Sequence, residues 1–99
     1  MKTFAQLKRD LKVGVKIRCL YNYYRENFPK EYRTITKVQT NAITLETITD
    51  DGIKQLWLYF PKSSTLVEYE NNIFKFFVEP NKYNNFTKTL EFIYEILEN

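Results

Sequence analysis

The feature that most limits how this chain can fold is a series of short segments in which apolar and polar residues alternate between Val15 and Val78. A period of two places successive side chains on opposite faces, which is the pattern of a half-buried β-strand. Ile35 and Val38 fall out of alternation and predict a bulge in the second segment. Strands are expected at 15–24, 32–39, 42–49, 53–60, 66–69 and 73–78.

Two of the turns between these segments have clear signals for antiparallel hairpins. The Asp-Asp-Gly run at 50–52 ends in a glycine that can take the positive φ of a tight turn. Asn71 and Asn72 form the second turn, and asparagine tolerates left-handed backbone. The segment 53–60 is apolar on both faces, so we expect it to be a central strand or one covered by a helix.

A helix is expected at each end of this strand region. At 3–12, Thr3 and Gln6 have capping-box spacing and Gly14 offers a stop. At 82–98, apolar residues return at helical spacing and form a stripe wide enough to need cover on two sides, which also suggests a homodimer through this helix. The expected fold class is α+β: a bent antiparallel sheet of five or six strands, SH3-like or another small open barrel, flanked by an N-terminal and a C-terminal helix.

The composition argues against an enzyme or a metal protein. The chain has no histidine, the residue most used for proton transfer near neutral pH. Its single cysteine, Cys19, alternates with Ile17 and Tyr21 on the face expected to be buried. We predict no catalytic residue, no metal site and no cofactor. One domain over 1–99 is expected, without a membrane span or signal peptide, in the cytoplasm.

Charge is distributed unevenly along the chain. Residues 1–40 hold ten Lys and Arg against three Asp and Glu, a formal charge of +7, whereas residues 41–99 carry −4. In the stretch 16–37, six cations are mixed with five aromatic residues. Cations follow a phosphate backbone and aromatic rings stack on bases, so this mixture predicts a nucleic-acid ligand.

The predicted site combines five cations for phosphates with two aromatic side chains for bases. Its residues are Lys16, Arg18, Arg25, Lys30 and Arg33, with Tyr24 and Phe28. The leading hypothesis is nonenzymatic binding of nucleic acid, single- or double-stranded DNA, although no known binding motif is present. The competing interpretation is that Glu91, Glu95 and Glu98 neutralise the basic third within the fold.

The alternative function is that of a protein-binding inhibitor or adaptor acting on a host or defence protein. Tyrosine and arginine are enriched at protein interfaces, and Phe28, beside Pro29 in an expected exposed loop, would supply an anchor. The wide apolar face of 82–98 would supply the rest of the docking surface. Both hypotheses describe a binding module without a catalytic step.

Three stretches carry a family resemblance: TFAQLKRDLKVG at 3–14, VQTN at 38–41 and PKSS at 61–64. In this pattern the chain resembles small uncharacterised proteins carried by phages and other mobile elements of low-GC Gram-positive bacteria. The resemblance covers most of residues 3–78 and implies a genomic setting but no catalytic residue. It suggests two roles, a replication or packaging accessory that binds DNA and an inhibitor that binds a host defence protein.

Overall fold

The computed structural model describes residues 1–98, which form one α-helix, seven strands and two short 3-10 helices. Helix α1 spans Phe4–Asp10, and the 3-10 helices lie at Ser64–Leu66 and Lys82–Asn84. The strands are β1 (Lys16–Asn22), β2 (Arg33–Val38), β3 (Ala42–Thr49), β4 (Gly52–Tyr59), β5 (Val67–Glu70), β6 (Ile73–Val78) and β7 (Thr89–Ile96). The expected α+β class is confirmed.

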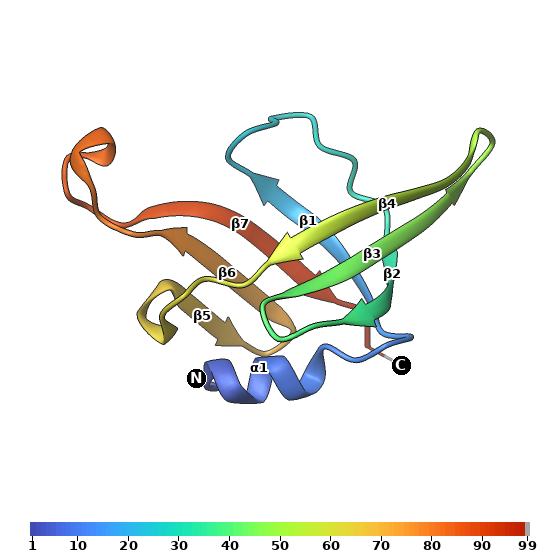
Figure 1. Ribbon diagram of the computed structural model, residues 1–99, viewed down its shortest axis with the longest axis horizontal. Helices are drawn as coiled ribbons and strands as arrows, with labels where there is room; N and C mark the ends of the chain where they lie inside the picture. The colour runs from blue at the N-terminus through green and yellow to red at the C-terminus, as the bar shows by residue number, and fades with distance from the viewer. Residues whose placement is uncertain (99) are drawn as a thin grey trace.

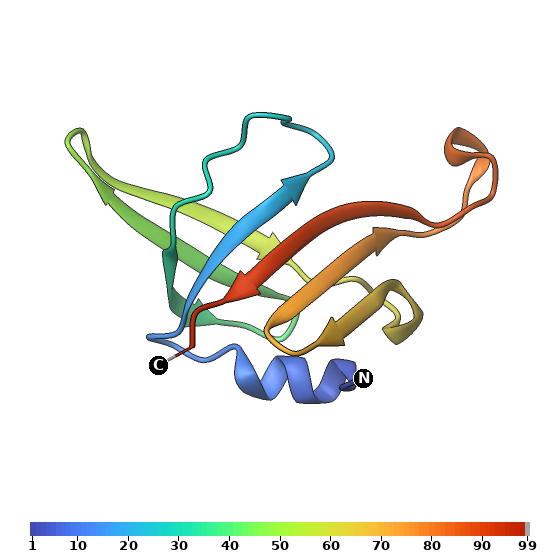
Figure 2. The same cartoon turned by 180° about the vertical axis from the view of Figure 1, so that it is seen from behind.

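All seven strands belong to one antiparallel sheet with the order β4-β3-β2-β1-β7-β6-β5. The sheet is bent but open, since β4 and β5 are its two edges and do not pair with each other. Figure 1 shows the β3–β4 hairpin and the end of the β6–β7 hairpin as two arms on either side of the β1–β2 loop. Helix α1 lies at the opposite end of the molecule from that loop (Figures 1 and 2).

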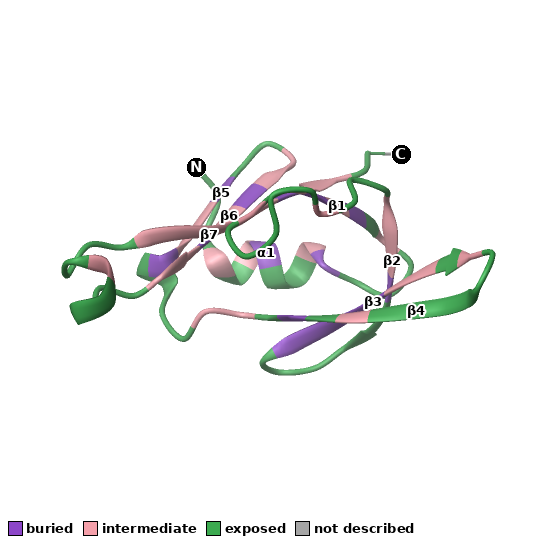
Figure 3. Cartoon of the chain, turned by 90° about the horizontal axis from the view of Figure 1, so that it is seen from above, coloured by how far each residue is buried: buried purple, intermediate pink, exposed green. Residues whose placement is uncertain are grey.

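The apolar core lies on the inner side of the bend, between the sheet and α1. Its buried members come from the helix region and every strand: Leu7, Leu11, Ile17, Cys19, Ile35, Ile43, Leu45, Leu58, Tyr69, Phe74, Phe76 and Tyr94. Phe60 packs edge-to-face against both Phe4 and Phe76, so it links the end of β4 to α1 and β6 without strand pairing. Figure 3 shows that the tip of the β3–β4 arm is exposed.

Local sequence signals account for several element boundaries. The Thr3 side chain accepts a hydrogen bond from the Gln6 backbone N–H at 3.1 Å and caps α1, as expected. Gly52 and Asn71 take positive φ at the two predicted hairpin turns. The register of β2 against β3 shifts after Ile35, which confirms the predicted bulge.

The prediction of a helix at 82–98 is wrong, because Thr89–Ile96 form strand β7. Leu90, Ile93 and Leu97 have the helical spacing on which this prediction is based. Phe92, Tyr94 and Ile96, however, alternate along a strand and pack on the core. β7 pairs with β1 on one side and β6 on the other, and its β-branched and aromatic residues favour this extended form. The sheet therefore has seven strands rather than five or six, and the helix face on which a homodimer was expected is absent.

The expectation that 53–60 forms a central or helix-covered strand is also wrong. β4 pairs only with β3 and is one edge of the sheet. Leu58 is buried in the core, whereas Ile53, Trp57 and Tyr59 are 65%, 51% and 64% exposed. Two apolar faces are thus not sufficient to make this strand central.

Candidate nucleic-acid interface

The predicted site residues lie on β1, β2 and the loop 23–32 that joins them, which we call the β1–β2 loop. This loop and α1 lie at opposite ends of the molecule (Figures 1 and 2). Arg9 and Lys12 lie on or next to α1, whereas Arg25 and Lys30 lie on the β1–β2 loop. The basic third of the sequence is therefore divided between two ends of the fold.

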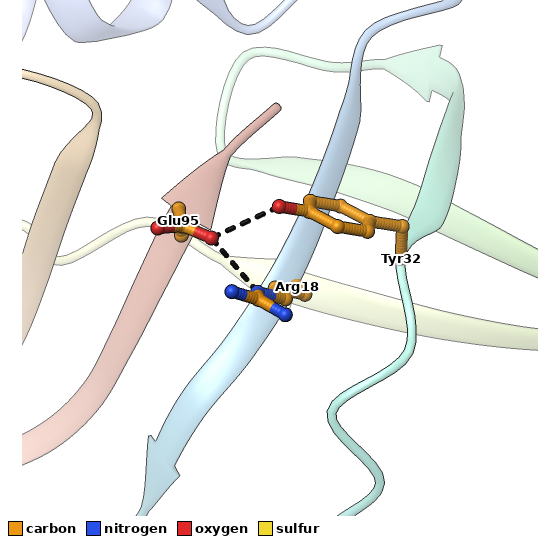
Figure 4. Close-up of polar contacts among 3 residues, drawn as sticks. All are labelled: Arg18, Tyr32 and Glu95. Carbon is orange, nitrogen blue, oxygen red and sulfur yellow. Dashed lines mark hydrogen bonds and ion pairs between the residues drawn. The ribbon is translucent and has the colours of Figure 1, made fainter. Parts of the chain in front are cut away.

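Arg18 is occupied by contacts within the fold (Figure 4). Its Nε donates to Glu95 Oε1 at 2.8 Å, and its guanidinium lies 4.9 Å from the centroid of the Tyr32 ring. The Tyr32 hydroxyl donates to the same oxygen at 2.9 Å, and this bond raises the pKa of Tyr32. Arg18 and Glu95 face each other across β1 and β7, so for this pair the competing interpretation of internal neutralisation is confirmed.

Phe28 is half-buried against the core and anchors the β1–β2 loop. The guanidinium groups of Arg25 and Arg33 lie over its ring, 5.3 and 5.4 Å from the centroid. The Arg33 side chain is only 11% exposed and lies 3.6 Å from Glu31. Arg33, at the start of β2, is thus packed within the fold, whereas Arg25 stays exposed beside the Phe28 ring.

Tyr24 is 63% exposed but is held in place by β7. Its hydroxyl donates to Glu91 Oε2 at 2.7 Å, and its ring contacts those of Tyr23 and Phe92. The hydrogen bond to the Glu91 carboxylate favours the protonated phenol and raises the pKa of Tyr24 to about 12. A ring that is already ordered loses little rotamer freedom when a ligand stacks on it.

A groove of about 230 Å³ lies between the end of β1 and the β1–β2 loop, and we call it the loop groove. It is lined by Cys19, Leu20, Tyr21, Asn22, Arg25, Glu26, Phe28 and Lys30. Arg25 and Lys30 are exposed here, and neither makes an ion pair within residues 1–98. Lys16 is also exposed, but it lies at the other end of β1, about 20 Å away at the usual rise of a strand. The fold thus brings Arg25, Phe28 and Lys30 together and places Lys16 and Arg18 elsewhere.

Tyr21 is an exposed groove residue that the alternation pattern missed. Alternation through Cys19 predicts an inward Tyr21, but the register of β1 against β7 shifts between these two residues. The resulting bulge places Tyr21 opposite Ile93 on the outer face, where it is 40% exposed. Tyr23 follows in the loop and is 57% exposed. No sequence signal marks this bulge.

Cys19 is buried on the inner face, as predicted. Its Sγ donates to the Tyr21 carbonyl oxygen at 3.1 Å, and burial raises the pKa of the thiol. The described part of the chain contains no group of three or more His, Cys, Asp or Glu side chains placed to hold a metal ion. Across residues 1–98, no helix has both the length and the apolar character needed to cross a membrane.

Searches against protein-family models, curated proteins and solved structures find no match for this chain. The indication of function therefore comes from the loop groove itself. Two exposed cations, Arg25 and Lys30, line this groove together with Tyr21, which is 40% exposed.

Proposed function

We propose that this chain is a nonenzymatic module that binds single-stranded nucleic acid along the loop groove. One observation carries the proposal: Arg25 and Lys30 are exposed at the groove, without an ion-pair partner in residues 1–98, next to the exposed Tyr21. Phosphates would bind the two cations through charge-assisted hydrogen bonds. Bases would stack on the tyrosine rings, which accept any base because every base has a flat apolar face.

The arrangement favours an unpaired strand and a small number of phosphate contacts. Tyr23 and Tyr24 present open rings on the same loop, and a base can stack on them only when it is free of its duplex neighbours. Arg18 and Arg33 are used within the fold, which leaves Arg25 and Lys30 as the phosphate ligands. With two contacts on a single strand, the slope of log K against log salt should be about −1.4.

A labelled oligothymidine titrated over a salt series tests this proposal. The variant Arg25→Gln with Lys30→Gln should lose binding at low salt and show a slope near zero, because both phosphate ligands are gone. The matched control, Arg9→Gln with Lys12→Gln, removes the same charge near α1, at the other end of the molecule. It should keep the wild-type slope.

Two results would overturn the proposal. One is the absence of binding at the lowest salt concentration. The other is an equal loss in both double variants, which would mean that net charge alone attracts the strand. A duplex of the same length, titrated in parallel, should bind more weakly than the single strand because its bases cannot reach the tyrosine rings.

For the alternative of a protein-binding inhibitor or adaptor, one of the two expected surfaces is absent and the other is only partly exposed. Phe28 packs against the core, and the segment 89–96 is a central strand rather than an exposed helix. The mobile-element setting implied by the resemblance stays a prediction, and it would suit an accessory protein that handles exposed DNA strands.

A further inference from the structure

The edge strand β4 presents a regular row of backbone groups that its own sheet does not use. The Phe60 N–H donates to the Asn41 carbonyl at 2.9 Å, so these two residues are a hydrogen-bonded pair of the β3–β4 ladder. Such pairs alternate with non-hydrogen-bonded pairs along antiparallel strands. The residues whose N–H and C=O groups face away from β3 are therefore Ile53, Gln55, Trp57 and Tyr59.

The two edges of the sheet differ in how they are protected. β5 has four residues, and the Lys2 N–H bonds to the Tyr69 carbonyl on its free side. β4 has eight residues, contains no proline and carries Lys54 as its one charged side chain. Long edges without such protection are templates for strand pairing. The exposed Ile53 and Trp57 make this edge apolar as well.

We propose that β4 pairs antiparallel with β4 of a second copy of this chain, around a two-fold axis at Leu56. In this register Ile53 lies opposite the second copy's Tyr59, and Gln55 lies opposite its Trp57. All four outward-facing residues of each chain are then hydrogen-bonded. An isologous interface of this kind closes on itself and gives a dimer rather than a fibre.

Neighbouring registers satisfy fewer backbone groups. An axis at Trp57 places Ile53 opposite Pro61, which has no N–H to donate. An axis at Gln55 places Tyr59 opposite Asp51, a turn residue outside the strand. An axis at Lys54 brings two like charges face to face. An axis at Leu56 avoids the missing N–H donor, the pairing with a turn residue and the contact between like charges.

Charge complementarity supports the same register. In this register the β3–β4 turn, which holds Asp50, lies beside the segment after β4 of the second copy, which holds Lys62, and the two-fold axis repeats this arrangement. Both side chains are exposed, and neither makes an ion pair within residues 1–98. Lys54 lies opposite Leu58, about 13 Å along the strand from the other Lys54. Opposite charges therefore meet and like charges stay apart.

Sedimentation over a concentration series tests the dimer. The wild type should dissociate on dilution, whereas Gln55→Pro should stay monomeric, because this N–H faces away from β3 and its loss spares the internal ladder. Asp50→Lys and Lys62→Asp should each weaken the dimer about tenfold, and the double variant should restore it. The Arg25→Gln, Lys30→Gln variant should dimerise like the wild type, so this result is independent of nucleic-acid binding.

Cysteine cross-linking tests the register. Leu56→Cys should link to its own copy under mild oxidation, because this non-hydrogen-bonded pair has Cα atoms about 4.5 Å apart. Gln55→Cys and Trp57→Cys should each cross-link poorly alone and well when mixed. The native Cys19 is buried and should not interfere. A monomer at every concentration, or best cross-linking at another position, would overturn the proposal. If the chain is a monomer, the β4 edge is free to pair with an extended segment of another protein.

Discussion

Strands β4 and β7 have the same length and a similar apolar content, but β4 is an edge of the sheet and β7 is an interior strand. Both have eight residues, and both are rich in aromatic and branched apolar side chains on two faces. β7 lies between β1 and β6, where Tyr94 is 2% exposed, whereas β4 is an edge on which Trp57 is 51% exposed. The composition of a strand indicates how well the segment suits a sheet, whereas the strands that pair with it determine how deeply it is buried.

Because of this difference, we expect β7 to contribute mainly to the stability of the fold and β4 to offer a surface for binding. β7 stacks Tyr94 on Phe74, pairs Glu95 with Arg18 and orders Tyr24 through Glu91. β4 pairs with β3 alone, and among its residues Leu58 is buried in the core. We therefore expect substitutions in β7 to lower the free energy of unfolding, and substitutions on the free side of β4 to change association instead.

The largest contrast is expected between Tyr94→Ala and Trp57→Ala. Tyr94→Ala should lower the free energy of unfolding by about 3–5 kcal/mol, because it removes a buried ring stacked 5.5 Å from Phe74. Trp57→Ala should cost less than about 1 kcal/mol, since the residue is already 51% exposed. Urea unfolding measures both, at a protein concentration low enough to keep the chain monomeric. Equal losses would contradict the assignment of β4 as an edge.

Proline substitutions at adjacent positions of β4 probe the direction of its backbone groups. Leu56→Pro removes an N–H that bonds to β3 and should cost about 1–3 kcal/mol more than Gln55→Pro, whose N–H faces solvent. Thermal unfolding of the two variants, at a protein concentration low enough to keep both monomeric, gives the comparison. The reverse order of stability would mean that the alternation along β4 has been assigned one residue out of step.

The ion pair at Glu95 is expected to have a smaller effect. Glu95→Gln weakens the bonds from both Arg18 and Tyr32 and should cost about 1 kcal/mol. The matched control is Glu68→Gln. Glu68 is on the edge strand β5, its side chain is 40% exposed, and its carboxylate lies 3.8 Å from the Lys88 Nζ. The control should cost less than about 0.5 kcal/mol in urea unfolding. A larger loss of stability in Glu68→Gln than in Glu95→Gln would mean that the polar contacts of β7 do not stabilise the fold more than those of the edge strand.

The smallest effect is a pH dependence at Tyr24. Glu91 raises its folded pKa to about 12, above the unfolded value of about 10. The hydrogen bond therefore stabilises the fold below about pH 10, and this contribution is lost as the pH rises through about 12. Tyr24→Phe lacks the bond, so the stability difference from the wild type should shrink over that range in urea unfolding. A difference that stays constant with pH would place the Tyr24 hydroxyl away from Glu91.

Local elements of the fold were predictable, and the candidate site only in part. The α1 cap at Thr3, the turn at Gly52 and the burial of Cys19 follow from neighbouring residues and were expected correctly. The groove residues Arg25 and Lys30 were named from the sequence. Tyr21 was missed because a bulge changes its face, and the use of Arg18 within the fold depends on a glutamate 77 residues away.

Short-range signals in this chain are sufficient for one capped helix, two tight hairpins and a set of amphipathic strands, because propensity, turn chemistry and alternation act over a few residues. They are not sufficient for strand order, since the segment 89–96 has Leu90 and Ile93 at helical spacing and Phe92, Tyr94 and Ile96 at strand spacing. Pairing with β1 and β6 on both sides selects the strand. Long-range pairing made β7 central and left β4 at the edge. It also joined Arg18 to Glu95 and left Arg25 and Lys30 exposed at the loop groove.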